Sequence, residues 1–123
     1  MNQGIRAECL VVDDEPAIRR TISLVLQDFG FSVREAGDAE TALAAIASER
    51  PDAIVADVRL PGMNGVELVR RVREGDGRRD LPIVLISAYE EPREHDADRF
   101  VSKPFDIEEL AQIVAEMVER NGS

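Results

Sequence analysis

Two acidic side chains stand together early in the chain, and a third carboxylate, a hydroxyl and an ammonium follow at separate points. Each stands at or near the end of a short apolar run; they are Asp13, Asp14, Asp57, Ser87 and Lys103. Carboxylates that are brought together repel one another and resist ionising together unless a cation compensates them. Mg²⁺ suits such a group best, because it takes oxygen ligands, keeps several waters and uses one or two carboxylates with a substrate phosphate. These residue types predict a magnesium-dependent site for a phosphoryl group.

Asp57 is the best-placed nucleophile of this set. A carboxylate beside a divalent cation and an ammonium can attack a phosphorus centre and form a high-energy aspartyl phosphate. Lys103 would supply a positive charge to the phosphoryl oxygens, and Ser87 a hydroxyl donor. Taken singly, each residue has a commoner explanation, since an Asp after a strand usually forms a turn and a lone Ser or Lys is usually solvated. Only their combination is specific.

The elements that must position these residues alternate between two patterns. Short apolar runs predict strands, at 9–12, 31–36, 53–56, 82–86 and 100–101. Apolar residues at helical spacing predict helices that begin near Pro16, Asp38, Asn64 and Asp106. Gly75 and Gly77 mark the end of the third helix. Strands that alternate with helices, without a hairpin signal, imply a parallel sheet covered on both faces, with function beyond the carboxyl ends of the strands.

The segment 89–98 breaks this alternation. It is charged throughout, only Tyr89 and Ala97 could be buried, and no apolar stripe is present to hold a helix. A crossover between parallel strands needs roughly ten residues, so the segment can just connect its neighbours. We predict a short or mobile loop here, with His95 as a solvated residue. The sheet flank left exposed would then invite a partner or a second copy of the chain.

Composition limits the classes of function. The chain has 123 residues, which fits one domain over 1–123, and its formal net charge of -10 argues against direct nucleic-acid binding. Cys9 is the only cysteine, so no intrachain disulfide forms and a buried thiol is expected. Residues 1–6 lack the apolar core of a signal peptide, and no later run is long enough to cross a membrane. We expect a cytoplasmic location and no membrane partner.

Four motifs resemble response-regulator receiver domains of two-component systems in their order and spacing. They are Leu10–Pro16, Asp57–Gly65, Ser87–Ala88 and Lys103–Phe105. The resemblance spans nearly the whole chain. It implies a flavodoxin-like α/β fold, a doubly wound sheet of five parallel strands in the order 2-1-3-4-5. In this chain the fourth helix of that fold would be shortened, atypical or disordered.

The same resemblance implies roles in phosphorelay signalling. Asp57 would accept a phosphoryl group from a histidine kinase or a histidine phosphotransfer protein. Asp14 would be the direct acidic ligand of Mg²⁺, Asp13 would act mainly through metal-bound water, and the backbone carbonyl of Arg59 would complete the protein's metal contacts, together with Asp57 itself. The Lys103–Pro104 bond resembles the family's cis peptide.

Further roles implied by the resemblance concern the output and lifetime of the signal. Lys103 and Ser87 would bind phosphoryl oxygens, and Ser87 would move inward as it does so. Phe100 stands where receiver domains carry the aromatic switch residue, and an aromatic packed in the core whatever the phosphorylation state is the alternative interpretation. Arg59 and Tyr89 are large residues that would shield the phosphoryl group from water and slow its loss.

Other functions fit the sequence less well. A phosphatase with an aspartyl-phosphate intermediate would usually carry a second Asp at position 59, where this chain has Arg. A flavin carrier of the same fold would need a phosphate loop after the first strand, where this chain has acids. We therefore expect no turnover enzyme. A receiver-like docking module that works without phosphorylation remains the alternative, and the downstream partner is a protein or a second copy of the chain.

Overall fold

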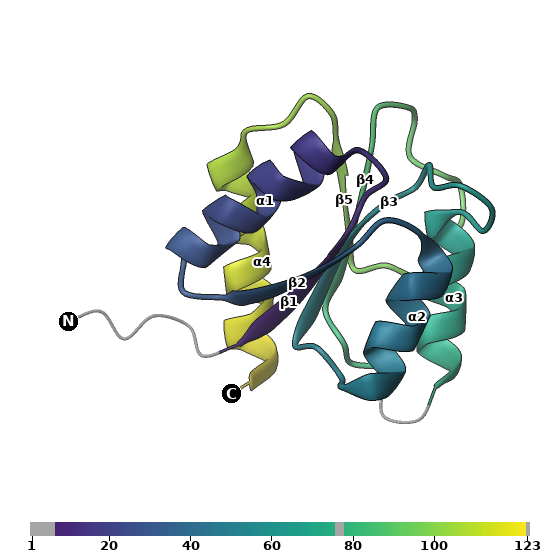
Figure 1. The fold of residues 1–123 in the computed structure, drawn as a ribbon, viewed down its shortest axis with the longest axis horizontal. Coiled ribbons are helices and arrows are strands. Elements are labelled where there is room, and N and C mark those ends of the chain that lie inside the picture. Colours follow the sequence, from purple (N-terminus) through teal and green to yellow (C-terminus); the bar gives the residue numbers. More distant parts are fainter. Residues whose placement is uncertain (1–6, 76–77, 123) are drawn as a thin grey trace.

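The computed structural model describes residues 7–75 and 78–122, so the expectations for residues 1–6 and for Gly77 lie outside the described residues. The elements follow one another as β1 (Glu8–Val12), α1 (Pro16–Asp28), β2 (Ser32–Ala36), α2 (Ala39–Ser48), β3 (Ala53–Asp57), α3 (Gly65–Glu74), β4 (Ile83–Ser87), β5 (Arg99–Ser102) and α4 (Ile107–Gly122). The strands form one sheet in the order β2-β1-β3-β4-β5 (Figure 1). Every neighbouring pair is parallel, which confirms the expected fold and strand order.

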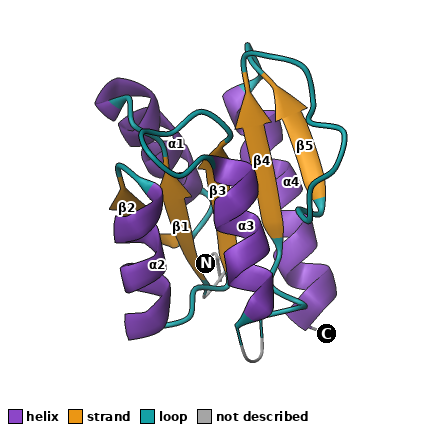
Figure 2. Cartoon of the chain, turned by 90° about the vertical axis from the view of Figure 1, so that its right-hand side faces the viewer, coloured by secondary structure: helices purple, strands orange, loops and turns teal. Residues whose placement is uncertain are grey.

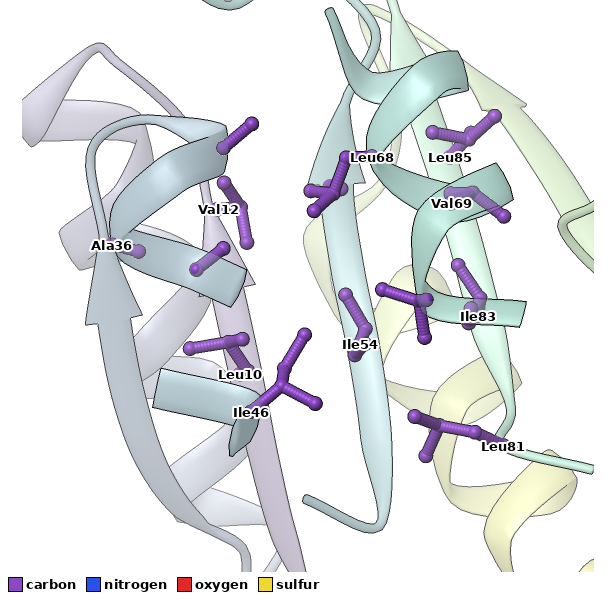
Figure 3. Packing of buried hydrophobic residues seen from close by; sticks show 14 residues of the cluster. Leu10, Val12, Ala36, Ile46, Ile54, Leu68, Val69, Leu81, Ile83 and Leu85 are labelled. Carbon is purple, nitrogen blue, oxygen red and sulfur yellow. The ribbon is translucent and has the colours of Figure 1, made fainter. Parts of the chain in front are cut away.

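The helices cover the sheet in two pairs, with α1 and α4 on one face and α2 and α3 on the other (Figure 1). Successive side chains of a strand point to opposite faces, so each buried strand contributes to both cores. In β1, Leu10 and Val12 pack toward α2 and α3, while Cys9 and Val11 pack toward α1 and α4. Figure 3 shows the first of these two clusters from close by. The uninterrupted apolar runs of the sequence are therefore explained by burial on both faces.

Short polar side chains start three of the helices soon after the preceding strand ends. Asp38 accepts a hydrogen bond from the backbone N of Thr41 at 2.7 Å, and Asn64 accepts one from that of Glu67 at 2.9 Å. Asp106 accepts from the backbone of the first turn of α4. These bonds satisfy donors that a helix start leaves free. No helix in the described part of the chain is both long and apolar enough to cross a membrane.

The connection between β4 and β5 contains no helix over residues 88–98, all of which are described (Figure 2). The loop prediction is thus confirmed, but the expectation of an exposed sheet flank is wrong. Ala97 and Phe100 pack against the core cluster, and Ile83 and Leu85 of β4 are fully buried. His95 is not solvated as expected, since its side chain is only 12% exposed. The loop thus contributes Ala97 to the core cluster, while most of its other side chains are exposed.

Candidate functional site

The chemistry-bearing residues gather at one edge of the sheet because the strands end at nearly the same level. Val12 pairs with Ala56, Asp57 with Ile86, and Ser87 with Ser102 across the successive strands. Asp13 therefore follows β1 directly beside the end of β3. Lys103 follows β5, and its backbone N donates to the backbone oxygen of Ser87 at 2.7 Å. Strand register alone brings side chains distant in sequence into one site.

Lys103 and Asp57 form the central contact of this site. The Nζ atom of Lys103 lies 2.5 Å from Oδ2 of Asp57 and 3.5 Å from Oδ2 of Asp13. The other carboxylate oxygen of Asp57 accepts a hydrogen bond from the backbone N of Arg59 at 2.9 Å. The Asp57 side chain is 7% exposed and that of Lys103 is 16% exposed. An ion pair so shielded from water is stronger than an exposed one, since solvent screens it less.

Asp13 is a buried carboxylate of the site with one oxygen that accepts no hydrogen bond. Its Oδ1 accepts from the backbone N of Glu15 at 2.9 Å, whereas its Oδ2 is buried without a hydrogen-bond partner. Burial, and then the nearby Asp57 carboxylate, raise the pKa of Asp13 above its usual value, against the effect of the Glu15 N–H and of Lys103. Partial burial would lower the pKa of Lys103, but its hydrogen bond to Asp57 and the two carboxylates raise it. The site is thus short of positive charge.

The residues present fit a magnesium ion. No three acidic, His or Cys side chains among the described residues converge into a ready cage. Mg²⁺ does not need one, because it keeps several waters and takes one or two carboxylates. Asp14 and Asp57 line one pocket, and the Oδ2 atom of the neighbouring Asp13 is buried without a hydrogen-bond partner, so it could accept a bond from a water of the ion. With the Arg59 carbonyl, these are the groups expected to hold the ion.

The pocket beside Asp57 has a volume of about 450 Å³. Asp14 and Lys103 lie along its wall, and Arg59 and Tyr89 approach each other at its edge. The guanidinium carbon of Arg59 stands 4.8 Å from the centroid of the Tyr89 ring, within cation–π range. Tyr89 is nevertheless 62% exposed, so this pair forms an outer rim and not a closed cover.

Ser87 and Phe100 lie apart from the pocket. Ser87 is buried at the end of β4, and its Oγ accepts a hydrogen bond from the backbone N of Tyr89 at 3.0 Å. Phe100 packs against the α2–α3 side of the sheet, and its ring lies 6.5 Å from that of His95. The structure therefore groups the proposed acceptor, metal and rim residues, while the two proposed switch residues sit beside them. The Lys103–Pro104 peptide is cis, as the resemblance implies.

Two supporting residues were not assigned a role from the sequence. Arg19 on α1 donates to the backbone oxygen of Asp13 at 2.8 Å and pairs with Glu35 on β2 at 3.0 Å, which anchors the acidic turn. Gly65 donates from its backbone N to the oxygen of Val58 at 2.8 Å. Glycine is a poor helix former, so a glycine at the first position of a predicted helix indicates that a side chain would not fit there. Nothing in the local sequence marks Arg19.

The family model described as the response regulator receiver domain matches residues 9–115. The DNA-binding response regulator MtrA of Mycolicibacterium smegmatis is 37% identical over 123 residues, covering 95% of this chain and 53% of that protein. Response regulator MprA of Mycolicibacterium vanbaalenii is 43% identical over 108 residues, covering 82% of this chain and 46% of that protein. The chain thus spans about half the length of these curated relatives.

Solved structures agree with this likeness. The chemotaxis response regulator CheY4 of Vibrio cholerae superposes with a TM-score of 0.84 at 33% identity, covering 92% of this chain and 99% of that one. The response regulator TrrA of Thermotoga maritima, solved in complex with Mg²⁺-BeF, has a TM-score of 0.82 at 33% identity, covering 90% of this chain and 98% of that one.

Proposed function

The chain belongs to the response regulator receiver domain family, and on that premise we propose that Asp57 accepts a phosphoryl group in a magnesium-dependent step. The donor is the phosphohistidine of a histidine kinase or a histidine phosphotransfer protein. The observation that carries the proposal is the short Lys103–Asp57 ion pair, buried beside the unpartnered oxygen of Asp13. The likeness to a regulator solved with Mg²⁺-BeF supports it.

The residues of this site divide the transfer between them. A carboxylate oxygen of Asp57 forms the new bond to phosphorus while the bond between phosphorus and the donor's imidazole nitrogen breaks. The backbone N of Arg59 and the ammonium of Lys103 hold the Asp57 carboxylate at fixed positions, which limits the entropy lost in reaching the transition state. Lys103 also places a positive charge next to the incoming phosphoryl oxygens. When bound, Mg²⁺ would supply positive charge that offsets the repulsion between the carboxylates of Asp13, Asp14 and Asp57.

The readout is a shift between two arrangements of Ser87 and Phe100. In this structure the Ser87 hydroxyl accepts from the Tyr89 backbone. A phosphoryl group on Asp57 adds strong acceptor oxygens, so Ser87 gains by moving to donate to one of them. Phe100 then moves into the space below the loop, which changes its packing against His95. The phosphoryl group favours this arrangement by its differential contacts.

The partners follow from the same proposal. The relatives named as DNA-binding regulators are about twice as long as this chain, so their DNA contacts need not involve the matched half. A net charge of -10 makes this chain a poor ligand for nucleic acid. We propose a protein partner in the cytoplasm, or a second copy of the chain, as the recipient of the switch.

Intact mass after incubation with Mg²⁺ and acetyl phosphate tests the function. The wild-type chain should gain one phosphoryl group only when Mg²⁺ is present, and Asp57→Asn should gain none. The matched control is Asp80→Asn, an exposed carboxylate away from this pocket, which should behave as wild type. Absence of an adduct with acetyl phosphate and with a phosphorylated histidine donor would instead favour a docking module that works without phosphorylation.

A further inference from the structure

The strand that carries Lys103 to its place has little support of its own. β5 has four residues, pairs only with β4, and follows a connection that contains no helix (Figure 2). Its outer residues Arg99 and Ser102 are exposed. A short edge strand of this kind has few contacts that define its register. Some other feature must fix where β5 begins.

Asp98 provides that feature by a two-point contact to the start of β4. Its backbone N donates to the backbone oxygen of Ile83 at 2.9 Å, and its Oδ2 accepts from the backbone N of Ile83 at 2.8 Å. Main chain and side chain of one residue thus bind both polar groups of a single partner. The residue after Asp98 is the first of β5, so this contact sets the starting register of the strand.

Arg73, near the end of α3, holds Asp98 in this position. Its Nη2 pairs with Oδ2 of Asp98 at 3.0 Å, and its Nε donates to the backbone oxygen of Asp96 at 3.0 Å. Its Nη1 contacts three further backbone oxygens at 2.7 to 3.1 Å, those of Arg78, Arg79 and Leu81. The side chain is 14% exposed. Only a guanidinium has enough donors in a fixed plane for this many acceptors.

The consequence reaches the site through the register of β5. Arg99 pairs with Val84 and Ser102 with Ser87, and Lys103 follows at once. A slip of one residue would turn every side chain of the strand to the opposite face, which would remove the Lys103 ammonium from Asp57. We propose that Arg73 and Asp98 are positioning residues for phosphoryl transfer, which fix β5 so that Lys103 reaches Asp57. This inference rests on the proposed function.

Phosphorylation rates of a double-mutant cycle test it. Arg73→Gln should lower the maximal rate of phosphorylation by acetyl phosphate by on the order of tenfold. The half-saturating Mg²⁺ concentration should change less than the rate, because the expected metal ligands lie at or just after the ends of β1 and β3, which Arg73 does not contact. In a Lys103→Gln background, Arg73→Gln should cause no further loss. The matched control is Arg70→Gln on the same helix, which should leave the rate unchanged. The ion pairs of Arg70 with Glu67 and Glu74 lie within α3 and do not include the connection between β4 and β5.

Asp98→Asn serves as the milder variant should Arg73→Gln fail to fold, since the amide oxygen still accepts from Ile83 while the charge facing Arg73 is lost. Hydrogen exchange at the amides of residues 99–103 is read in parallel. Both variants should speed that exchange and spare the exchange of β3. Equal rate losses in the wild-type and Lys103→Gln backgrounds, or unchanged exchange in β5, would overturn the inference. A wild-type chain that takes no phosphoryl group would refute the proposed function instead, and the exchange data would still decide whether Arg73 fixes β5.

Discussion

Gly65 lies so close to the backbone of Asp57 that a β-carbon at position 65 would stand 2.3 Å from the Asp57 carbonyl oxygen. The same β-carbon would stand 3.0 Å from the Cα of Val58, whose oxygen accepts from the Gly65 backbone. The loop that follows Asp57 therefore returns to its own start before α3 begins. Helix packing and the position of the acceptor carboxylate are coupled through this one contact.

We predict that Gly65→Ala lowers the free energy of unfolding by about 1 to 3 kcal/mol, because backbone atoms must move to admit the methyl group. The phosphorylation rate should fall with it, since the displaced atoms belong to Asp57. Urea unfolding and intact-mass kinetics measure the two effects. The comparison is Gly62→Ala in the same loop, where φ is +73° and no atom lies within 4 Å of the added carbon. It should cost about 1 kcal/mol of backbone strain and spare the rate. A wild-type rate for Gly65→Ala would refute the coupling.

Asp13→Asn should stabilise the metal-free protein. Asn keeps an oxygen for the Glu15 backbone N and removes a charge that is unfavourable chiefly because it is buried, which is also what raises the pKa of Asp13. We expect a gain of about 1 kcal/mol in the free energy of unfolding without Mg²⁺, and a smaller further gain when Mg²⁺ is added than the wild type shows. Chemical unfolding with and without saturating Mg²⁺ measures both. Asp38→Asn, which can still cap α2, is the control and should respond to Mg²⁺ as the wild type does. Loss of stability in metal-free Asp13→Asn would contradict this prediction.

The contact between Arg59 and Tyr89 should lengthen the life of the phosphoryl group. Replacing both by Ala removes the rim of the pocket and admits water to the acyl phosphate, so phosphate should be lost faster than from the wild type. The decay of the phosphorylated mass after removal of the donor measures this rate. Tyr89→Phe retains the ring face above which Arg59 lies and should decay like the wild type. An unchanged lifetime for the double variant would end this hypothesis.

Glu35 should contribute stability that disappears in acid. Burial alone would raise its pKa, but the hydrogen bonds from Arg19, Ser23 and Arg20 outweigh burial and keep the pKa below its usual value of 4.5. A carboxylate with a lowered pKa stabilises the fold above its unfolded pKa and loses that contribution as the pH falls through its folded pKa. Glu35→Gln should thus cost about 1 kcal/mol at neutral pH, and the difference from wild type should shrink below pH 4.5.

Urea unfolding of both proteins across this pH range provides the measurement. Glu74→Gln removes an exposed partner of Arg70 and should change stability little at any pH. A difference between wild type and Glu35→Gln that stayed constant down to strongly acidic pH would show that the pair with Arg19 adds no pH-dependent stability.

Much of the fold could be predicted because its strands are buried on both faces and its helix starts carry side-chain caps. The runs at 9–12 and 82–86 are short and lack polar alternation, which favours strands buried on both faces, and the polar residues that end them fall at the strand ends of the structure. β5 was predicted at two residues and has four, because an edge strand with Arg99 and Ser102 exposed leaves no apolar run to detect.

The parts that could not be predicted depend on specific contacts made by single polar residues. His95 stands in a charged segment, yet it bonds to Glu91 at 2.7 Å, accepts from the backbone N of Ala97 and packs against Phe100. No periodic pattern reports such contacts. Arg73 likewise has the sequence context of an ordinary charged residue of an amphipathic helix, and its contacts to Asp96 and Asp98 form only in the folded chain. The exposed flank was expected for the same reason.

The helix-free connection between β4 and β5 separates the residues of the site from a group of exposed side chains. Phosphotransfer depends on strand ends, whose geometry tolerates little change, whereas Glu90, Arg93 and Glu94 are exposed and belong to neither core cluster. Mutations there can accumulate without loss of the reaction. A change of these three side chains should therefore alter the charge of the molecular surface next to β5 without moving the strand ends that hold Asp57 and Lys103.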